Sequence, residues 1–155
     1  MRAVIQRVSS ASVVSDGVLT GKIEQGLMLL LGVAKGDEKL DAELLAAKIS
    51  KLRIFSDEND KMNKSVKDIE GSALVVSNFT LSANYAHGNR PDYISAAKPD
   101  EANRLYLYFK DKLASQLVSG KVETGMFGEH MEIDAHCNGP ITIVMDSEVL
   151  KGKNK

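Results

Sequence analysis

Two hydroxyl side chains lie close together in the segment Ser77-Asn78-Phe79-Thr80-Leu81. A serine or threonine hydroxyl becomes a nucleophile when a base within hydrogen-bonding distance accepts its proton. None of the three histidines lies near this segment in the sequence, and the segment lacks the Gly-x-Ser-x-Gly pattern of a nucleophile elbow. We therefore expect both hydroxyls to make hydrogen bonds on a strand, with a conventional serine or threonine esterase as an alternative.

Four side chains of types that bind metals alternate along one short segment, namely His130, Glu132, Asp134 and His136. In a strand these four would share one face. The residues between them form an opposite face without charges, and this alternation is typical of any half-exposed strand. Because no Cys-x-x-Cys or His-Glu-x-x-His spacing accompanies the row, we expect a solvent-exposed face and no bound metal.

The single cysteine, Cys137, follows directly after His136. Adjacent residues of a strand point to opposite faces, so the imidazole would not reach the sulfur. Free cysteine is among the most buried residue types, and we expect Cys137 in the core. A single cysteine also excludes an intramolecular disulfide framework and indicates a reducing compartment.

The pair Gly139-Pro140 lies between two expected strands. Peptide bonds before proline are the ones that adopt the cis form at modest cost, and glycine lets the backbone approach another group closely. Taken alone, the pair is also what an ordinary turn contains.

The composition is that of one globular domain that can bury its own core. The chain has 155 residues, of which 43% are hydrophobic and 26% are charged. No apolar run approaches the length of a membrane-spanning helix, and the first residues do not form the hydrophobic region of a signal peptide. We therefore expect a cytoplasmic protein with no membrane partner. The formal net charge of −1 provides no general field for nucleic acid, so such a partner would need a local patch and a matching shape.

Hydrophobic periodicity predicts a mixture of strands and helices. Strands are expected at residues 2–8, 11–15, 18–23, 27–33, 52–55, 73–81, 121–124, 131–137 and 141–146. The Asp16-Gly17 pair predicts a hairpin. Helices are expected after Asp37 and Asp100, each of which would cap a first turn, with Tyr108 on the inner face of the second helix. Because strands and helices do not alternate strictly, we predict an α+β fold with a curled or barrel-like, mostly antiparallel β-sheet and two main helices.

Six short strings occur in the same order as in one protein family. They are Met1-Arg2-Ala3-Val4-Ile5-Gln6-Arg7-Val8, Leu52-Arg53-Ile54-Phe55, Val75-Val76-Ser77-Asn78-Phe79-Thr80-Leu81, Arg90-Pro91, Val122-Glu123-Thr124-Gly125-Met126-Phe127-Gly128 and Gly139-Pro140-Ile141-Thr142. With them, residues 1–146 resemble the D-aminoacyl-tRNA deacylases. We therefore predict a single deacylase-like domain at residues 1–146 and a flexible, lysine-rich tail at residues 147–155.

The resemblance implies a homodimer that hydrolyses the ester between a D-amino acid, or glycine, and the 3′ end of tRNA, which is chiral proofreading in translation quality control. It also implies an active site at the interface of two subunits, without a metal ion or an organic cofactor. We expect no DNA partner. With little net charge available, Arg90, Lys110 and the lysines of the tail are the candidates for contacts with the tRNA phosphates.

Two positions depart from the family's motifs. Asn78 replaces the glutamine of Ser-Gln-Phe-Thr-Leu, and Cys137 replaces the first asparagine of Asn-x-Gly-Pro-x-Thr. A protein that binds the end of tRNA with lost or altered hydrolysis is therefore a second alternative.

The resemblance implies that Ser77, Asn78, Phe79 and Thr80 form the catalytic strand that lines the substrate pocket. An aminoacyl ester is already reactive and has a vicinal ribose hydroxyl beside it. Positioning the ester and polarising its carbonyl with backbone N–H groups would supply much of the rate. We adopt assistance by the 2′-hydroxyl of the RNA, with Thr80 as nucleophile kept as the alternative.

The resemblance also implies a set of substrate-binding residues. Phe127 and Met131 match positions that hold the terminal adenosine and its surroundings, and Ala96 matches a small residue of the pocket wall. Gly139 and Pro140 match a cis pair that family members insert into the pocket of the neighbouring subunit.

Overall fold

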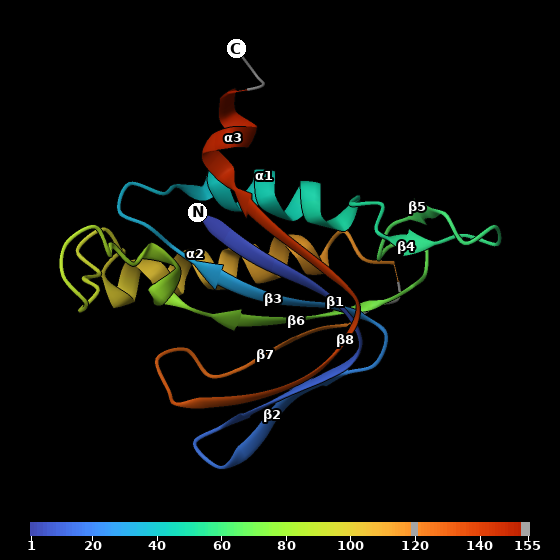
Figure 1. Ribbon diagram of the computed structural model, residues 1–155, viewed down its shortest axis with the longest axis horizontal. Coiled ribbons are helices and arrows are strands. Elements are labelled where there is room, and N and C mark those ends of the chain that lie inside the picture. The colour runs from blue at the N-terminus through green and yellow to red at the C-terminus, as the bar shows by residue number, and fades with distance from the viewer. Residues whose placement is uncertain (119–120, 153–155) are drawn as a thin grey trace.

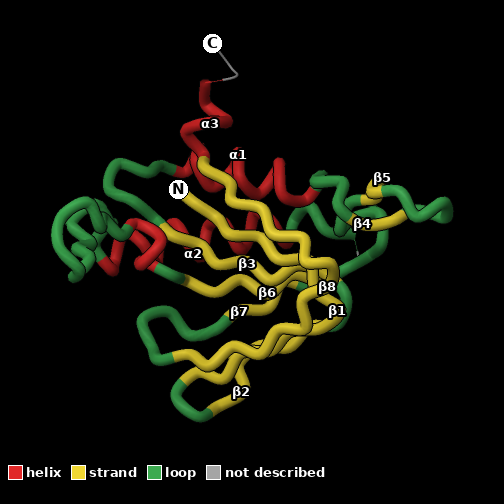
Figure 2. The backbone as a smooth tube through the Cα atoms, viewed as in Figure 1, coloured by secondary structure: helices red, strands yellow, loops and turns green. Residues whose placement is uncertain are grey.

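The computed structural model describes residues 1–118 and 121–152 and has an α+β architecture (Figure 1). Two helices, α1 (Lys39–Ser50) and α2 (Pro99–Ala114), lie side by side against one face of a six-stranded sheet. Figure 2 shows the strands curling away from these helices. The predicted fold class is confirmed. Within the described ranges, no helix is long and apolar enough to cross a membrane.

The sheet is built around two long strands, β1 (Arg2–Ser15) and β8 (Met131–Asp146), which pair antiparallel over most of their length. On its other side, β1 pairs with β3 (Gly26–Gly32) through its first half and with β2 (Val18–Ile23) through its second half. Register shifts in the middle of β1 separate these halves, and such shifts bend a strand. One strand thereby belongs to two parts of the curled sheet.

Strands β6 (Ser72–Ser77) and β7 (Val122–Thr124) extend the sheet beyond β3 with parallel pairing, whereas the other pairs in this sheet are antiparallel. The bend in β1 brings β2 close to β6 and β7, so the sheet is nearly closed. Residues of β6 alternate between the helix-covered face and the interior of the curl, and both sets are buried. The uninterrupted apolar sequence of this strand predicted such a central position.

Two apolar cores lie on opposite faces of the sheet. The larger fills the space between the sheet and the two helices, where Leu45, Ile49, Leu105 and Phe109 are 0% exposed. The smaller core lies inside the curl and consists of Val8, Ala11, Val13, Ile23, Met28, Leu74 and Val76.

Both helices begin close to the caps that the sequence suggested, but not at them. Helix α1 is capped by Glu38, which forms a capping box with Asp41. Asp37 instead accepts a hydrogen bond from the Met1 ammonium group at 2.6 Å. Helix α2 begins at Pro99, two residues earlier than expected, because proline needs no hydrogen-bonded N–H in the first turn.

The C-terminal segment differs from the flexible tail that the sequence indicated. Residues 147–151 form helix α3 (Ser147–Lys151), which packs against α1. The Ser147 hydroxyl donates to Asp41 at 2.6 Å and accepts from the Met1 ammonium group at 2.7 Å. The Lys151 Nζ lies 2.7 Å from the same Asp41 carboxylate. These partners are distant in the sequence, and the local signal for the helix was its N-cap, Asp146, which accepts from the Glu148 N–H at 3.0 Å. Residues 153–155 lie outside the described ranges.

A separate two-stranded sheet, formed by β4 (Phe55–Ser56) and β5 (Met62–Lys64), replaces the strand expected at residues 52–55. Its turn is closed by Asp57, whose carboxylate accepts from the N–H groups of Asn59 and Lys61. Figure 1 shows this small sheet projecting at one end of the molecule.

Candidate active site

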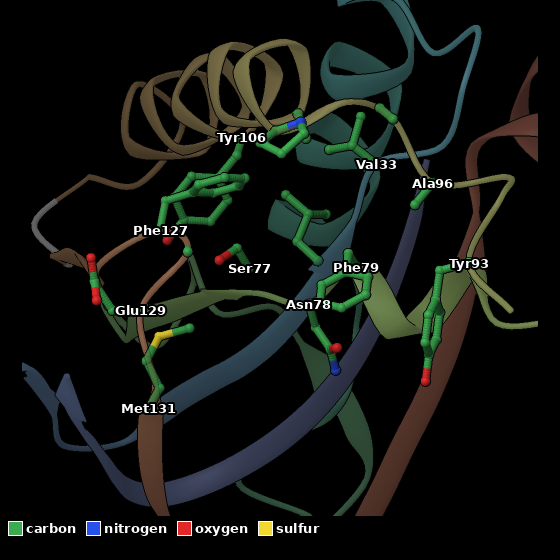
Figure 3. Close-up of a pocket in the computed structure, with 15 residues that line it drawn as sticks. Val33, Ser77, Asn78, Phe79, Tyr93, Ala96, Tyr106, Phe127, Glu129 and Met131 are labelled. Atoms are coloured by element: carbon green, nitrogen blue, oxygen red, sulfur yellow. The ribbon is translucent and has the colours of Figure 1, made fainter. Parts of the chain in front are cut away.

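A cavity of about 500 Å³ opens between the end of β6, the start of α2 and the connection from β7 to β8. Figure 3 shows its lining. Six of the residues singled out from the sequence line it together, namely Ser77, Asn78, Phe79, Ala96, Phe127 and Met131. They come from separate segments spread over residues 77–131, and the fold therefore brings the predicted set into one place.

The segment that follows β6 is not a continuous strand, as the sequence suggested. The strand ends at Ser77, and residues 79–82 form a short 3₁₀ helix, η1 (Phe79–Ser82). Asn78 caps this helix, because its side-chain oxygen accepts from the Thr80 N–H at 3.2 Å and also from the Thr80 hydroxyl. Asparagine favours such local side-chain contacts, which compete with continuation of a strand. The last ladder bond, from the Asn78 N–H to Leu31, comes just before Phe79.

Phe79 and Tyr93 form one aromatic wall of the cavity. Their rings meet edge to face with centroids 5.0 Å apart, although Phe79 remains 58% exposed. Behind Tyr93, Ala96 forms an isolated β-bridge with Ala34, and the Ala97 N–H donates to Val33. The wall is thus attached to the end of β3, as Figure 3 shows for Ala96 and Val33.

Tyr106 forms the base of the cavity and was not identified from the sequence, which assigned Tyr108 to the inner face of α2. The Tyr106 hydroxyl donates to the Val75 carbonyl at 2.7 Å, and its ring lies 5.7 Å from that of Phe127. Burial raises the pKa of Tyr106 to about 12, so the phenol stays protonated and cannot act as a base near neutral pH. The spacing of Ala102, Tyr106 and Phe109 on one helical face was the available signal.

An acidic pair lies at one rim of the cavity. Glu129 lines the cavity, and hydrogen bonding to Asp16, together with charge repulsion from it, raises the pKa of the Glu129 carboxyl above its ordinary value. A backbone hydrogen bond from Asp16 to His130 at 3.0 Å connects the two segments. Sequence patterns did not reveal this pair, because the hairpin residue and the later loop are more than 100 positions apart.

Gly139 and Pro140 do not line the cavity of their own chain. Their peptide bond is cis, as expected, but β8 continues through them instead of turning. Gly139 has φ +135°, and a β-carbon there would lie 2.7 Å from the Ile141 nitrogen, which explains the glycine.

Arg7 holds the backbone next to this pair. Its Nε donates to the Asn138 carbonyl and one terminal nitrogen donates to the Asn138 side chain, both at 3.0 Å. The other terminal nitrogen donates to the Ile54 carbonyl at 2.8 Å. The sequence analysis missed this role, since it depends on the pairing of β1 with β8.

Three further expectations meet different outcomes. Thr80 is exposed beside the cavity and does not line it. Cys137 is exposed instead of buried, because the irregular pairing of β1 with β8 interrupts the regular alternation of buried and exposed positions there. Asp134 and His136 are also exposed, and no group of three or more potential metal ligands converges within residues 1–118 and 121–152.

The arrangement favours binding and polarisation over an activated nucleophile. The Thr80 hydroxyl donates a hydrogen bond to the Asn78 amide oxygen, which is too weak a base to remove its proton. The cavity wall is largely apolar. The backbone N–H of Phe79 lies at this wall, one residue beyond the last hydrogen bond that joins this segment to β3, from the Asn78 N–H to the Leu31 carbonyl. An N–H group held on a rigid segment can stabilise negative charge on a carbonyl oxygen.

Comparisons with known proteins identify the family of this chain. Residues 4–146 match the family model described as D-Tyr-tRNA(Tyr) deacylase. The D-aminoacyl-tRNA deacylase of Ruegeria pomeroyi is 54% identical over 146 residues, which cover 94% of this chain and 99% of that protein. The D-aminoacyl-tRNA deacylase of Thermosipho melanesiensis is 48% identical over 148 residues, covering 96% of this chain and 98% of that protein.

Solved structures share the same fold. The chain superposes on a protein named c-Myc DNA Unwinding Element Binding Protein with a TM-score of 0.88 and 35% identity, covering 94% of this chain and 98% of the other. It superposes on a probable eukaryotic D-amino acid tRNA deacylase with a TM-score of 0.78 at 14% identity, with the same coverage, which bears on the fold alone. By the match of its sequence over nearly its whole length, the chain belongs to the D-aminoacyl-tRNA deacylase family.

Proposed function

We propose that this protein hydrolyses the ester between a D-amino acid, or glycine, and the 3′ end of tRNA. The observation that carries the proposal is the position of Ser77, Asn78 and Phe79 at the wall of a cavity that Phe127 and Met131 also line. Membership of the deacylase family supports the same reaction. As an enzyme of translation quality control, the protein would act in the cytoplasm.

The proposed chemistry is water attack on the ester carbonyl, which releases the free amino acid and restores the 3′-hydroxyl of the tRNA. The N–H groups near Phe79 would polarise the carbonyl, and the vicinal 2′-hydroxyl of the ribose would assist the proton transfers. Phe127 and Met131 would hold the terminal adenosine, while Ala96 keeps the wall shallow. Neither a protein nucleophile nor a cofactor is required for this reaction.

We infer that two copies of the chain form the working unit. Strand β8 pairs with β1 alone among the described strands, so its other edge is left open, and open edges are usually covered. Large apolar side chains are exposed near this edge and at the cavity, including Val144 at 65% and Phe79 at 58%. A second copy placed against β8 would cover them and bring its Gly139-Pro140 pair to the first copy's cavity.

This arrangement would explain selection for the D-enantiomer. The two enantiomers carry the same groups, so weak binding alone cannot reject the L-form, and a repulsive element is needed where only its side chain would lie. Backbone carbonyls of Gly139-Pro140 from the second copy would supply that element, because a backbone cannot rotate away as a side chain can. Glycine, which has no side chain, would escape the filter.

The test is a hydrolysis assay with D-tyrosyl-tRNA, L-tyrosyl-tRNA and a free D-tyrosine ester. We expect release of D-tyrosine from tRNA, with the L-form largely spared and the free ester cleaved poorly. Equal rates on both enantiomers would refute the proposal. Binding of tRNA without release would indicate the tRNA-end binding alternative, and efficient cleavage of the free ester would indicate a conventional esterase.

A further inference from the structure

A projecting loop, residues 84–92, leaves the wall of the cavity between Phe79 and Tyr93. Its ends are joined, because Asn84 and Asp92 exchange two backbone hydrogen bonds of 2.8 and 2.9 Å. A side-chain hydrogen bond of 3.1 Å between the same residues closes it further. Figure 1 shows the loop at the end of the molecule opposite the small sheet of β4 and β5. The loop is therefore a defined projection attached to the candidate active site.

The side chains on this loop are unusually free of contacts with the rest of the chain. Tyr85 is 81% exposed, and His87 and Arg90 are also exposed. Within residues 1–118 and 121–152, Arg90 makes neither a side-chain hydrogen bond nor an ion pair. An exposed aromatic ring and an unpaired guanidinium on one loop contribute little to folding, but surfaces that bind single-stranded nucleic acid have this composition.

The charges around the cavity are distributed unevenly. Residues 71–91 contain no aspartate or glutamate, although the chain has 21 of them. The one acid of the loop, Asp92, has both carboxylate oxygens occupied by the side chain of Asn84 and the N–H of Ile94. The other rim of the cavity carries Glu129 beside Asp16. A polyanion that ends in the cavity would therefore be repelled at the acidic rim and accepted on the loop side.

We propose that loop 84–92 binds the single-stranded nucleotides that precede the terminal adenosine of the substrate. Tyr85 and His87 offer ring faces on which bases can stack, and Arg90 contacts a backbone phosphate. The proposal rests on the proposed function, since it names the part of the RNA that lies outside the cavity during hydrolysis. It also explains how a chain with a net charge of −1 holds tRNA without a general basic field.

The experiment compares two substrates, D-tyrosyl-tRNA and 3′-D-tyrosyl-adenosine, which lacks the preceding nucleotides. Tyr85→Ala and Arg90→Ala should each raise KM for the tRNA about tenfold, with kcat little changed, because stacking and phosphate contacts act on binding. Both variants should hydrolyse the aminoacyl-adenosine within about twofold of the wild type. Arg90→Ala should also reduce the slope of log KM against log salt by about 0.7, the value for one phosphate contact on a single strand.

Lys61→Ala is the matched control, because this exposed cation lies on the β4–β5 turn at the far end of the molecule. It should leave KM for both substrates unchanged. Equal losses on both substrates would overturn the proposal, since the loop would then shape the cavity. Dissociation of a dimer by Tyr85→Ala, measured by light scattering after gel filtration, would also overturn it and assign the loop to a subunit contact.

Direct binding separates failure of this inference from failure of the proposed function. A short, unacylated RNA hairpin that carries the single-stranded 3′ end of tRNA is titrated with each protein, and fluorescence anisotropy is measured. We expect about tenfold weaker binding for Tyr85→Ala and Arg90→Ala, even if the wild type hydrolyses neither ester. Wild-type affinity in both variants would refute the role of the loop while leaving the hydrolysis result untouched.

Discussion

Helices α1 and α2 bury their face of the sheet, whereas the end that carries the cavity leaves large apolar side chains in solvent. Leu45, Ile49 and Phe109 are 0% exposed on the covered face, but Phe79 is 58% and Tyr85 81% exposed at the cavity end. Burial of the first set stabilises a single chain, since each large apolar side chain removed from water contributes about 1.5–3 kcal/mol. The second set contributes little to folding and is suited to contacts with a substrate or a second copy.

The two regions also differ in how their polar groups are used. Under α3, the Met1 ammonium group, Asp37, Asp41 and Ser147 bond to one another and are buried. At the cavity end, the polar contacts of the wall segment are exposed to solvent, as are those of Asn78 with Thr80 and of Asn84 with Asp92. Mutations should therefore separate the regions by their effects, on stability in one case and on activity in the other.

The largest expected effect is on the covered face. Phe109→Ala removes a fully buried ring and should lower the free energy of unfolding by about 3–5 kcal/mol, because the cavity left behind is only partly filled. Urea unfolding followed by circular dichroism measures it. Leu107→Ala, on the exposed side of the same helix at 47% exposure, is the control and should change stability by less than about 0.5 kcal/mol. Equal losses of unfolding free energy in both variants would contradict the difference between the buried and the exposed side of the helix.

A smaller loss is expected where α3 meets α1. Asp41 is 0% exposed and bonds to Ser147 and Lys151. Asp41→Asn therefore leaves the Lys151 ammonium group without its buried counter-charge and weakens the hydrogen bond from the Ser147 hydroxyl. The free energy of unfolding at pH 7 should fall by about 2–3 kcal/mol. Glu43→Gln removes a half-exposed carboxylate of α1 that Lys112 and the Tyr108 hydroxyl of α2 contact, and the loss of stability should be much smaller.

The same carboxylate predicts a pH dependence. Burial by itself would raise the pKa of Asp41, but hydrogen bonds from Lys151, Ser147 and the Glu38 N–H outweigh it and hold the pKa below its ordinary value. Its stabilisation is therefore present above the unfolded pKa of about 3.9 and is lost as the pH falls through the folded pKa. Urea midpoints measured from pH 7 down to pH 2 should fall less steeply in Asp41→Asn than in the wild type. If the urea midpoints of the two proteins fall in parallel, Asp41 contributes nothing to the loss of stability at acidic pH.

Beside the Gly139-Pro140 pair, which we propose enters the cavity of a second copy, the expected effect is on activity. Arg7→Ala removes three hydrogen bonds that hold Asn138 and Ile54 beside the Gly139-Pro140 pair. We expect kcat/KM on D-tyrosyl-tRNA to fall about thirtyfold, which corresponds to about 2 kcal/mol.

A matched control exists in the small sheet of β4 and β5. Arg53 binds the carbonyl and the side chain of Asn63 through the same two kinds of donor, at 2.9 and 2.8 Å, but makes no hydrogen bond to Asn138. Arg53→Ala should leave kcat/KM within about twofold of the wild type. A similar loss of activity in both variants would show that the effect is general destabilisation.

The smallest effect is expected at Thr80. Thr80→Val removes a hydroxyl that donates a hydrogen bond to Asn78 and has no base to activate it, so kcat should stay within about fivefold of the wild type. Denaturing mass spectrometry during turnover should find no covalent acyl-enzyme in either protein. A fall in kcat of several orders of magnitude, with unchanged urea unfolding, would restore Thr80 as the nucleophile.

Several of these features could be read from the sequence by itself. The apolar run at residues 73–76 predicted a central strand, and helical spacing predicted both α1 and α2. The motifs around Ser77, Phe127 and Gly139 indicated the family, and the first two of them also indicated part of the cavity lining. Such features depend on neighbouring residues, or on strings long enough to be distinctive, and both are present in the order of the amino acids.

Only the tertiary structure decided the remaining features, because each depends on residues that are distant in the sequence. Arg7 reaches Asn138 through the pairing of β1 with β8, and Tyr106 reaches Val75 through the packing of α2 on the sheet. Helix α3 is held by Asp41, and irregular strand pairing exposes Cys137. A periodic pattern reports which residues of an element share a face, but the partner of that face is selected by packing across the whole chain.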